Sequence, residues 1–329
     1  MPQEAFNVIN RRFGELGPGN HRIRVAYKTG FGVYLRGTAE NALPELQMSG
    51  LSRGINLVFT SPPFPLNTKK RYGNLKGQDY VDWLASFAPK FVDLLTPSGS
   101  IVLEMGNAWE PGQPVMSTLA LKALLAFLEK GKLQLCQQFV WCNPAKLPTP
   151  AQWVNVERIR VKDAFTHLWW MAPKLRPKAS NRRILQSYSA AMRELLTRQT
   201  YNSGPRPSQH HIGKTSFLIN NGGAIPSNVL TCANTQSNCN YLTYCRSHNI
   251  APHPARMPVE VARFFIKFLT QKGDIVLDPF GGSNVTGAAA ESLARNWICV
   301  ERKTDYIRAS AARFRPASNG STSNGRHRR

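Results

Sequence analysis

Short apolar runs alternate with longer amphipathic segments along most of the 329-residue chain. The apolar runs that have the length of a buried strand span residues 55–59, 100–104, 133–141, 165–171, 274–278 and 297–301. Between them, apolar side chains recur at helical spacing over residues 80–95, 117–130, 258–270 and 284–295. This alternation predicts an α/β fold built on a doubly wound, mostly parallel sheet, and residues 24–36 are expected to add a strand or hairpin.

Local signals refine the helical segment at 80–95. Asp79 precedes it and is expected to cap its N-terminus. Pro89 lies inside the pattern and is expected to kink or split the helix, because proline lacks a backbone donor. The tripeptide Pro97-Ser98-Gly99 predicts a turn before the next strand.

The alternation stops between residues 173 and 250, a stretch rich in Gly, Pro, Asn, Ser and His. We interpret residues 173–250 as a smaller lobe inserted between two parts of a main domain, at 23–172 and 251–315. Residues 1–22 are expected to form a flexible N-terminal arm. Residues 316–329, which lack large apolar side chains, are expected to form a disordered tail.

Positive charge is in large excess and is unevenly placed. The chain has 42 Lys and Arg against 19 Asp and Glu, a formal net charge of +23. Residues 164–259 contain eleven Lys and Arg but a single acid, Glu194. A basic segment so poor in acids favours a polyanionic partner, for which nucleic acid is the usual choice. The alternative is a basic surface that is merely solvated.

The sequence favours a cytoplasmic protein without metal. No stretch is long and apolar enough to span a membrane, and the N-terminus lacks a signal-peptide pattern. The six cysteines are sparse for this length and are interpreted as reduced thiols. The spacings of Cys232, Cys239, Cys245, His248 and His253 match no standard zinc pattern, so no metal site is predicted.

Two loops carry the candidate chemistry, and each directly follows an apolar run. The first, Ser61-Pro62-Pro63-Phe64, is called the Ser-Pro-Pro-Phe loop. The second, Asp278-Pro279-Phe280-Gly281-Gly282-Ser283, is called the Gly-Gly loop. Because ligands of an open α/β sheet bind outside the carboxyl ends of its strands, the two loops are expected to share one crevice.

The Gly-Gly loop is typical of a site for a nucleotide-like cofactor. Gly281 and Gly282 allow close approach of the backbone, and the start of the following helix offers free N–H groups. About twenty residues further on, Glu301 ends a strand, where an acid suits a pair of ribose hydroxyls. The Gly-x-Gly-x-x-Gly pattern of dinucleotide sites is absent here, and a packing turn without ligand is the remaining alternative.

The Ser-Pro-Pro-Phe loop has groups suited to grip an exocyclic amine. The amino groups of cytosine and adenine are poor nucleophiles because their lone pair is delocalised into the ring, so an enzyme must accept hydrogen bonds from both N–H groups. Two prolines fix φ and can leave the Pro62 carbonyl directed outward as one acceptor, and Ser61 Oγ is a second. Phe64 can stack on the base, which must be flipped out because the amine is inaccessible within the duplex.

Together these motifs resemble the DNA cytosine-N4 methyltransferases of type II restriction–modification systems, in the N4/N6 amino-methyltransferase family. The resemblance covers roughly residues 30–313. It rests on Thr60-Ser61-Pro62-Pro63-Phe64, Tyr72-Gly73-Asn74, Lys146-Leu147-Pro148, His253-Pro254-Ala255-Arg256-Met257-Pro258 and the Gly-Gly loop. The order of the motifs, with the catalytic loop before the cofactor loop, is the β arrangement of that family.

The resemblance implies a class I methyltransferase fold that uses S-adenosylmethionine and acts on double-stranded DNA. It implies that residues 173–250 are a target-recognition lobe, that the main domain is catalytic, and that the protein is nucleoid-associated with a cognate restriction endonuclease as functional partner. The implied catalytic residues are Ser61, Pro62, Pro63, Phe64 and Glu104, the last as a proton acceptor near Ser61. The implied cofactor-binding residues are Asp278, Phe280, Gly281, Gly282, Ser283, Glu301 and His253. The expected DNA contacts are Lys69, Lys70, Arg71, Arg182 and Arg183.

Alternatives and departures from the family pattern remain. Serine at position 61 points to cytosine N4, whereas adenine-N6 members more often carry Asp or Asn there, so adenine methylation is the alternative, followed by a non-catalytic DNA-binding protein. Cytosine-C5 methylation is disfavoured because the chain has no Pro-Cys dipeptide to supply a thiolate nucleophile. Members usually carry an acid after the strand that matches Tyr34-Leu35, but Arg36-Gly37-Thr38 has none. Asn284 stands where the family often has glycine.

Overall fold

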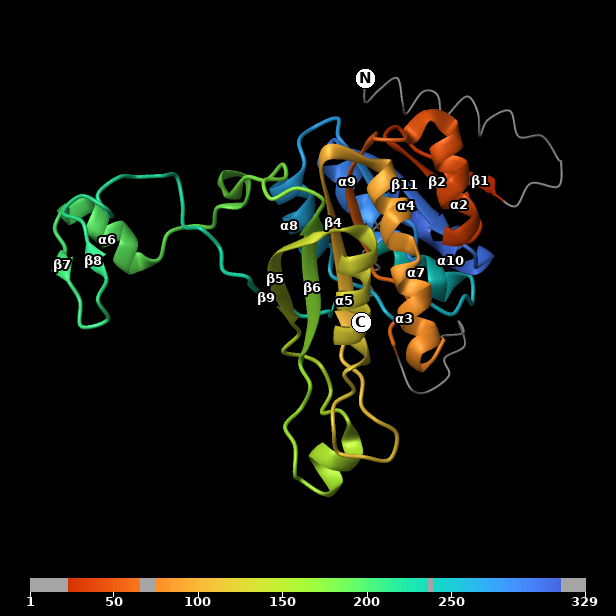
Figure 1. Cartoon of the computed structure of the whole chain (residues 1–329), viewed down its shortest axis with the longest axis horizontal. Helices are drawn as coiled ribbons and strands as arrows, with labels where there is room; N and C mark the ends of the chain where they lie inside the picture. The colour runs from red at the N-terminus through yellow and green to blue at the C-terminus, as the bar shows by residue number, and fades with distance from the viewer. Residues whose placement is uncertain (1–22, 66–74, 236–238, 315–329) are drawn as a thin grey trace, which may run out of the picture.

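The computed structural model describes residues 23–65, 75–235 and 239–314. Nine strands form one sheet in the order β1-β2-β11-β10-β3-β4-β6-β5-β9, with helices on both faces (Figure 1). The strands are β1 (Arg24–Lys28), β2 (Gly32–Arg36), β3 (Ile55–Thr60), β4 (Leu95–Gly106), β5 (Gln134–Cys142), β6 (Phe165–Ala172), β9 (Val229–Thr231), β10 (Ile275–Asp278) and β11 (Asn296–Glu301). The five adjacent strands β2, β11, β10, β3 and β4 are parallel, whereas β1 and β6 are antiparallel to their neighbours. The predicted doubly wound, mostly parallel α/β fold is confirmed.

The direction of winding reverses at β3. The chain passes from β3 to β4 on one side, while β10 and β11, from the far end of the chain, lie on the other side. β3 and β10 are in register, with Val276 opposite Leu57 and Leu277 opposite Val58. Their carboxyl ends therefore meet at the point where an open α/β sheet binds ligands, and both candidate loops begin there.

Two layers of helices cover the sheet and enclose two apolar cores. The helices on one face are α2 (Ala39–Leu46), α3 (Gly77–Ala85), α4 (Phe87–Leu94) and α5 (Leu119–Gly131). The opposite face is covered by α8 (Val259–Leu269) and α9 (Val285–Ser292), followed by α10 (Thr304–Ser310). In α8 the buried residues Val261, Phe265 and Leu269 recur every four positions, which is the spacing that predicted this helix. Within the described segments, every helix is too short or too polar to span a bilayer.

Two local predictions need correction. The cap of α3 is Lys76 rather than Asp79, because the helix begins at Gly77 and Asp79 lies in its first turn. The expected break does occur, but at Ser86, and Pro89 lies in the first turn of α4, where a missing backbone donor costs nothing.

The predicted turn at 97–99 is part of β4. Ile55 lies opposite Leu95, and Leu57 lies opposite Ser100, so β4 has extra residues between two points that are only two residues apart on β3. The turn residues therefore form an irregularity inside a long strand rather than a break before it.

The predicted lobe at 173–250 divides into two parts in the structure. Its middle holds α6 (Ala190–Arg198) and the short pair β7 (Gly204–Pro205) and β8 (His211–Ile212), which extend away from the sheet and contain no buried residue (Figure 1). By contrast, β9 pairs with β5, and α7 (Asn240–Ser247) buries Tyr241 and Cys245 against Ala309. The main body thus resumes before residue 250. The sequence did not predict this, because β9 is too short to be recognised as a strand.

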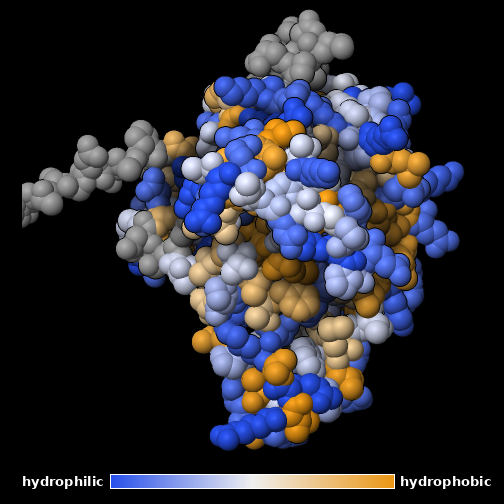
Figure 2. Space-filling view, turned by 90° about the vertical axis from the view of Figure 1, so that its left-hand side faces the viewer, coloured by the Kyte–Doolittle hydropathy of each residue, from blue (hydrophilic) through white to orange (hydrophobic). Residues whose placement is uncertain are grey.

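A second projection leaves the carboxyl edge of the sheet. It consists of the connections 107–118 and 143–164, and it includes the short helix η2 (Gln152–Val156). Figure 1 shows it below the sheet, and Figure 2 shows hydrophilic and hydrophobic side chains intermixed on it at the bottom of the view. The name rim projection is used below for the second of these connections, residues 143–164.

Candidate active site

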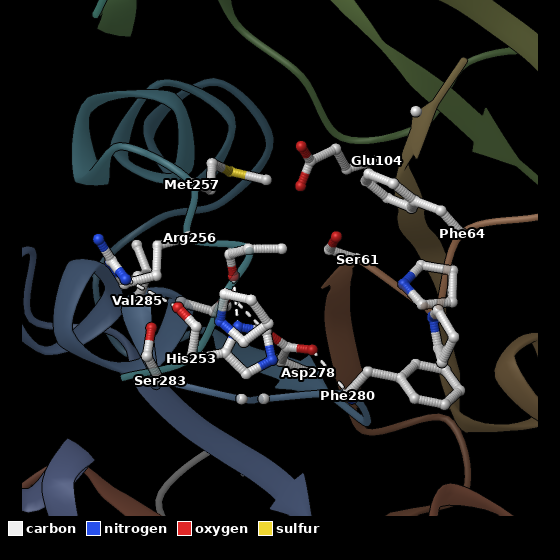
Figure 3. A pocket seen from close by; sticks show the side chains of 18 of the residues that line it. Ser61, Phe64, Glu104, His253, Arg256, Met257, Asp278, Phe280, Ser283 and Val285 are labelled. Atoms are coloured by element: carbon white, nitrogen blue, oxygen red, sulfur yellow. Dashed lines mark hydrogen bonds between the residues drawn. The ribbon is translucent and has the colours of Figure 1, made fainter. Parts of the chain in front are cut away.

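A cavity of about 810 Å³ opens at the carboxyl edge, where β3, β4, β10 and β11 end. Every catalytic and cofactor-binding residue predicted from the sequence lines it, which brings together residues from both halves of the chain. In Figure 3, Ser61, Phe64 and Glu104 lie on one side of the cavity, and His253, Ser283 and Val285 lie on the opposite side. The expectation that the two loops share one crevice is confirmed.

Asp278 links the two loops through a buried hydrogen-bond network. Thr60 Oγ1 donates to Asp278 Oδ1 at 2.6 Å, and Thr286 Oγ1 donates to Oδ2 at 2.6 Å. The backbone N–H of Phe280 also donates to Oδ1, at 3.1 Å. Burial raises the pKa of Asp278 to about 6, although these donors act to lower it. Because Thr60 directly precedes Ser61, the carboxylate fixes the start of one loop relative to the other.

The Ser-Pro-Pro-Phe loop is also held from the side of α3. Tyr80 Oη donates to the Pro63 carbonyl at 2.8 Å. The Phe64 ring lies against Gly106, where an added Cβ would come within 2.6 Å of the ring, so the end of β4 requires glycine here. No donor in the described part of the chain reaches the Pro62 carbonyl. The loop therefore lies fixed at its ends while an acceptor between them stays available.

Glu104 is a buried carboxyl at the end of the strand next to β3, with 5% of its surface exposed. Burial raises the pKa of Glu104 to about 7, and the negative charge of Asp278 adds to this shift. Hydrogen bonds from Ser61 and Thr166 act in the opposite direction. The result is an acid that can gain or lose a proton near neutral pH, beside the serine of the Ser-Pro-Pro-Phe loop.

The Gly-Gly loop needs its glycines for close approach and for a left-handed backbone. A Cβ on Gly281 would come within 2.9 Å of the Tyr34 ring. Gly282 has a φ of +50°, and its carbonyl accepts a hydrogen bond of 2.8 Å from Tyr34 Oη. Asn284 also has a left-handed φ, +55°, and its side chain caps α9 by accepting from the Gly287 N–H at 2.9 Å. Asparagine tolerates this conformation better than other residues, which explains why it can replace glycine here.

Glu301 supports the same loop from the end of β11. Its carboxylate accepts backbone hydrogen bonds from Gly282, Arg302 and Lys303 at 3.1, 2.9 and 2.8 Å. Burial raises the pKa of Glu301, and the three donors counteract part of that effect. One acid thus closes the Gly-Gly loop onto the adjacent strand while still lining the cavity.

Ser283 and His253 complete this side of the cavity. Arg313 Nη2 donates to Ser283 Oγ at 3.2 Å, which orients the serine. His253 Nδ1 hydrogen-bonds to the Ala255 carbonyl, and the backbone N–H of His253 donates to Tyr241 Oη at 2.8 Å. Burial lowers the pKa of His253, so the ring is neutral at pH 7 and packs across the Gly-Gly loop.

Sequence reasoning missed several residues of the site. Thr60 belongs to the quoted motif but carries no signal of its partner, and Tyr80 was assigned only as an apolar helical position. Glu40 lies just beyond the acid-free tripeptide 36–38, lines the cavity, and accepts a hydrogen bond of 2.9 Å from Trp83 Nε1. Burial acts to raise the pKa of Glu40, but hydrogen bonds, chiefly from Trp83, lower it overall. The acid missing from one position is thus present a short distance along the chain.

Of the predicted DNA contacts, only Arg182 and Arg183 lie within the described residues. Arg183 donates from Nε to the Lys267 carbonyl at 2.7 Å and from Nη2 to the Phe268 carbonyl at 2.6 Å, so its guanidinium closes the C-terminus of α8. That end of α8 precedes β10, so Arg182 and Arg183 lie at the amino edge of the sheet, opposite the cavity. This placement argues against the expected DNA contacts of Arg182 and Arg183. Lys69, Lys70 and Arg71 lie outside the described residues, as do the arm at 1–22 and the tail at 316–329.

Comparisons with known proteins agree with this geometry. A family model described as DNA methylase, of the N6 and N4 type, matches residues 55–312. The type II methyltransferase M.PvuII of Proteus hauseri is 44% identical over 272 residues, which are 82% of this chain and 81% of that protein. The solved structure of the PvuII DNA methyltransferase (cytosine-N4-specific) superposes with a TM-score of 0.71 at 38% identity over 89% of each chain. The S-adenosyl-L-methionine complex of TTHA0409, a DNA modification methylase homologue from Thermus thermophilus, shares the fold, with a TM-score of 0.51 at 18% identity over 87% of this chain and 93% of that one.

Proposed function

The chain belongs to the DNA methylase family of N6 and N4 amino-methyltransferases, and from this membership we propose that it transfers a methyl group from S-adenosylmethionine to N4 of a cytosine in double-stranded DNA. The 44% identity to a type II methyltransferase supports a role as the modification half of a restriction–modification system. The observation that carries the proposal is the joining of both loops at one cavity through Thr60 and Asp278.

The residues of the Gly-Gly side fit S-adenosylmethionine. Gly281 and Gly282 let the cofactor approach the backbone closely, and Glu301 offers carboxylate oxygen at the edge of the cavity to ribose hydroxyls. Trp83 and Phe280, whose ring centroids are 5.7 Å apart, supply an aromatic wall, and Glu40 supplies the acid that the sequence lacks at 36–38. When bound, the cofactor supplies an electrophilic methyl group on a sulfonium sulfur.

The opposite side of the cavity fits a cytosine that has left the helix. Ser61 Oγ and the Pro62 carbonyl accept hydrogen bonds from the two N–H groups of the amine and localise its lone pair. Phe64 stacks on the ring. As the amine gains a methyl group it becomes cationic and must lose a proton, and Glu104, with a pKa of about 7, is placed to accept it.

Recognition of the DNA sequence is assigned to the part of the lobe that extends from the sheet, between residues 185 and 228, beyond the arginines that pack on α8. This segment lies between the catalytic and the cofactor halves of the chain, and its side chains are largely exposed. Groove-reading side chains must be free to meet base edges, which the absence of burial in α6, β7 and β8 permits.

The test is methyl transfer by the purified chain from labelled S-adenosylmethionine to duplex DNA, followed by nucleoside analysis. We expect N4-methylcytosine, and no transfer by the Ser61→Ala variant. N6-methyladenine alone would move the assignment to adenine, and 5-methylcytosine would reject the mechanism. If the protein bound DNA but transferred no methyl group, even to a DNA that contains all short sequences, it would be a non-catalytic DNA-binding protein.

A further inference from the structure

The tip of the rim projection is an exposed surface of unusual composition. Residues 155–162 are eight consecutive exposed residues with the sequence Asn-Val-Glu-Arg-Ile-Arg-Val-Lys. Three β-branched apolar side chains are left in solvent, with exposed fractions of 67% for Val156, 48% for Ile159 and 86% for Val161. Single exposed apolar residues are common, but three within six positions, interleaved with basic residues, indicate a surface that another molecule covers.

The tip is held in a defined conformation. The backbone N–H of Ile159 donates to the Trp153 carbonyl at 2.9 Å, and the N–H of Glu157 donates to the Gln152 carbonyl at 2.9 Å. Arg160 Nε donates to the Pro114 carbonyl at 2.9 Å, which ties the tip to the neighbouring connection 107–118. The exposed side chains therefore stand on a frame that stays folded when nothing covers them.

The base of the projection is the rim of the cavity. Asp163 closes this base, because it accepts from Asn107 Nδ2 at 2.8 Å and pairs with Lys146 at 3.4 Å. Lys146, near the start of the projection, and Phe165, the first residue of β6, both line the cavity. A molecule that delivers a group into the cavity from this edge consequently passes beside residues 155–162.

Arg158 is the side chain best placed to meet a polyanion. Its backbone has a φ of +57°, a left-handed conformation that is uncommon for arginine, and the residue is exposed. Its guanidinium has no hydrogen-bond or ion-pair partner among the described residues, whereas Arg160 and Lys162 donate to backbone carbonyls. The charge of Arg158 thus remains available to a partner.

We propose that residues 155–162 contact the sugar–phosphate backbone of the duplex beside the cavity, with Arg158 on a phosphate and Val161 against deoxyribose. The proposal rests on the proposed function, because it takes duplex DNA as the molecule that feeds a base into the cavity. DNA backbone presents anionic phosphates separated by apolar sugars, which matches basic side chains interleaved with aliphatic ones. The contact positions the DNA without reading its sequence.

The test compares two arginines with the same backbone conformation. Arg53 is also exposed, with a φ of +56°, but it precedes β3 at the amino edge of the sheet, away from the cavity. Asparagine tolerates a left-handed φ, so Arg158→Asn and Arg53→Asn remove equal charge with little backbone strain. For a duplex of random sequence, Arg158→Asn should flatten the slope of log affinity against log salt by about 0.9 and weaken binding about eightfold at roughly 0.1 M salt. Arg53→Asn should leave both quantities at the wild-type values.

A third variant tests the apolar part and a different occupant. Val161→Thr keeps the side-chain shape and should weaken duplex binding about threefold with an unchanged salt slope. Equal behaviour of Arg158→Asn and Arg53→Asn, in a wild-type protein that binds and methylates DNA, would overturn the inference while the proposed function stands. A wild-type protein that neither binds nor methylates DNA would overturn both. Self-association in sedimentation that Val161→Thr abolishes, with DNA binding unaffected, would assign the surface to a second copy of the chain instead.

Discussion

The two loops that face the cavity are held in different ways. In the Gly-Gly loop, hydrogen bonds from the rest of the protein engage the Asp278 carboxylate, the Gly282 backbone and the Ser283 side chain. The Ser-Pro-Pro-Phe loop is anchored at its two ends, by Thr60 and by the Pro63 carbonyl. One loop is preorganised around a ligand that is the same in every turnover, whereas the other keeps acceptors directed at a base that arrives from DNA.

The carboxylates beside these loops repeat the contrast. Glu301 is buried but accepts from three backbone N–H groups, which stabilise its charged form. Glu104 is buried with only hydroxyl groups as donors, and its pKa rises to about 7. Burial raises the pKa of both acids, but backbone donors oppose this effect at Glu301, and Glu104 is the acid whose pKa reaches the neutral range.

The largest effect is expected for Glu104→Gln, which keeps the shape but cannot accept the proton. Loss of a general base typically costs about 10²–10⁴ in turnover, while cofactor affinity should stay at the wild-type value. Single-turnover methyl transfer and calorimetry with S-adenosylmethionine measure the two separately.

The same variant should be more stable than wild type at pH 8. The pKa of Glu104 in the folded state, about 7, lies above the value of 4.5 in the unfolded chain, so the stability it contributes is complete below pH 4.5 and is lost as the pH rises through 7. Glutamine avoids that loss, which corresponds to about 3 kcal/mol from the difference of the two pKa values. Turnover close to wild type, or lower stability at pH 8, would exclude Glu104 as the buried base.

The next effect tests the connection between the loops. Thr60→Val removes one donor to the Asp278 carboxylate, and a hydrogen bond to a charged group is worth about 1.5–3 kcal/mol. Because Asp278 serves both loops, cofactor affinity and turnover should fall together, by about tenfold or more. Thr60→Ser keeps the hydroxyl and should behave as wild type. If Thr60→Val impaired only one of the two quantities, the loops would not be coupled through Asp278.

Lowering the pH should impair methyl transfer and cofactor binding at different pH values, without any mutation. Glu104 becomes protonated as the pH falls below about 7, so turnover should drop about tenfold between pH 7 and pH 5.5. The pKa of Asp278 is lower, about 6, so cofactor binding should decline only at the acidic end of this range. The pH profiles of single-turnover rate and of cofactor affinity check this order. Coincident profiles would contradict it.

The sequence predicted the fold and the cavity well because their signals are local. Each buried strand is an apolar run, and the ends of parallel strands meet at one edge, so the Ser-Pro-Pro-Phe and Gly-Gly loops could be placed together. The bond between Thr60 and Asp278 spans 218 residues and depends on which strands are neighbours, which periodicity does not reveal. The contact of Arg183 with the end of α8 could not be predicted for a related reason, since a count of basic residues cannot distinguish a guanidinium that closes a helix from one that faces DNA.

The smallest effects are expected for Tyr→Phe changes at two buried tyrosines, one on each side of the cavity. Tyr80 Oη holds the Pro63 carbonyl, and Tyr241 Oη accepts from the backbone of His253, beside the Gly-Gly loop. Each Tyr→Phe change removes one hydrogen bond to the backbone, worth about 1 kcal/mol or a factor of about five. It also removes a weaker contact to sulfur, with Met105 for Tyr80 and with Cys245 for Tyr241. Tyr80→Phe should lower turnover and leave cofactor affinity intact, because it releases only the loop that receives the base. Tyr241→Phe should weaken cofactor binding and leave turnover at saturating cofactor unchanged. Single-turnover rates and cofactor titrations on the two variants measure these opposite effects. If both variants changed the same quantity, the two sides of the cavity would act as one unit.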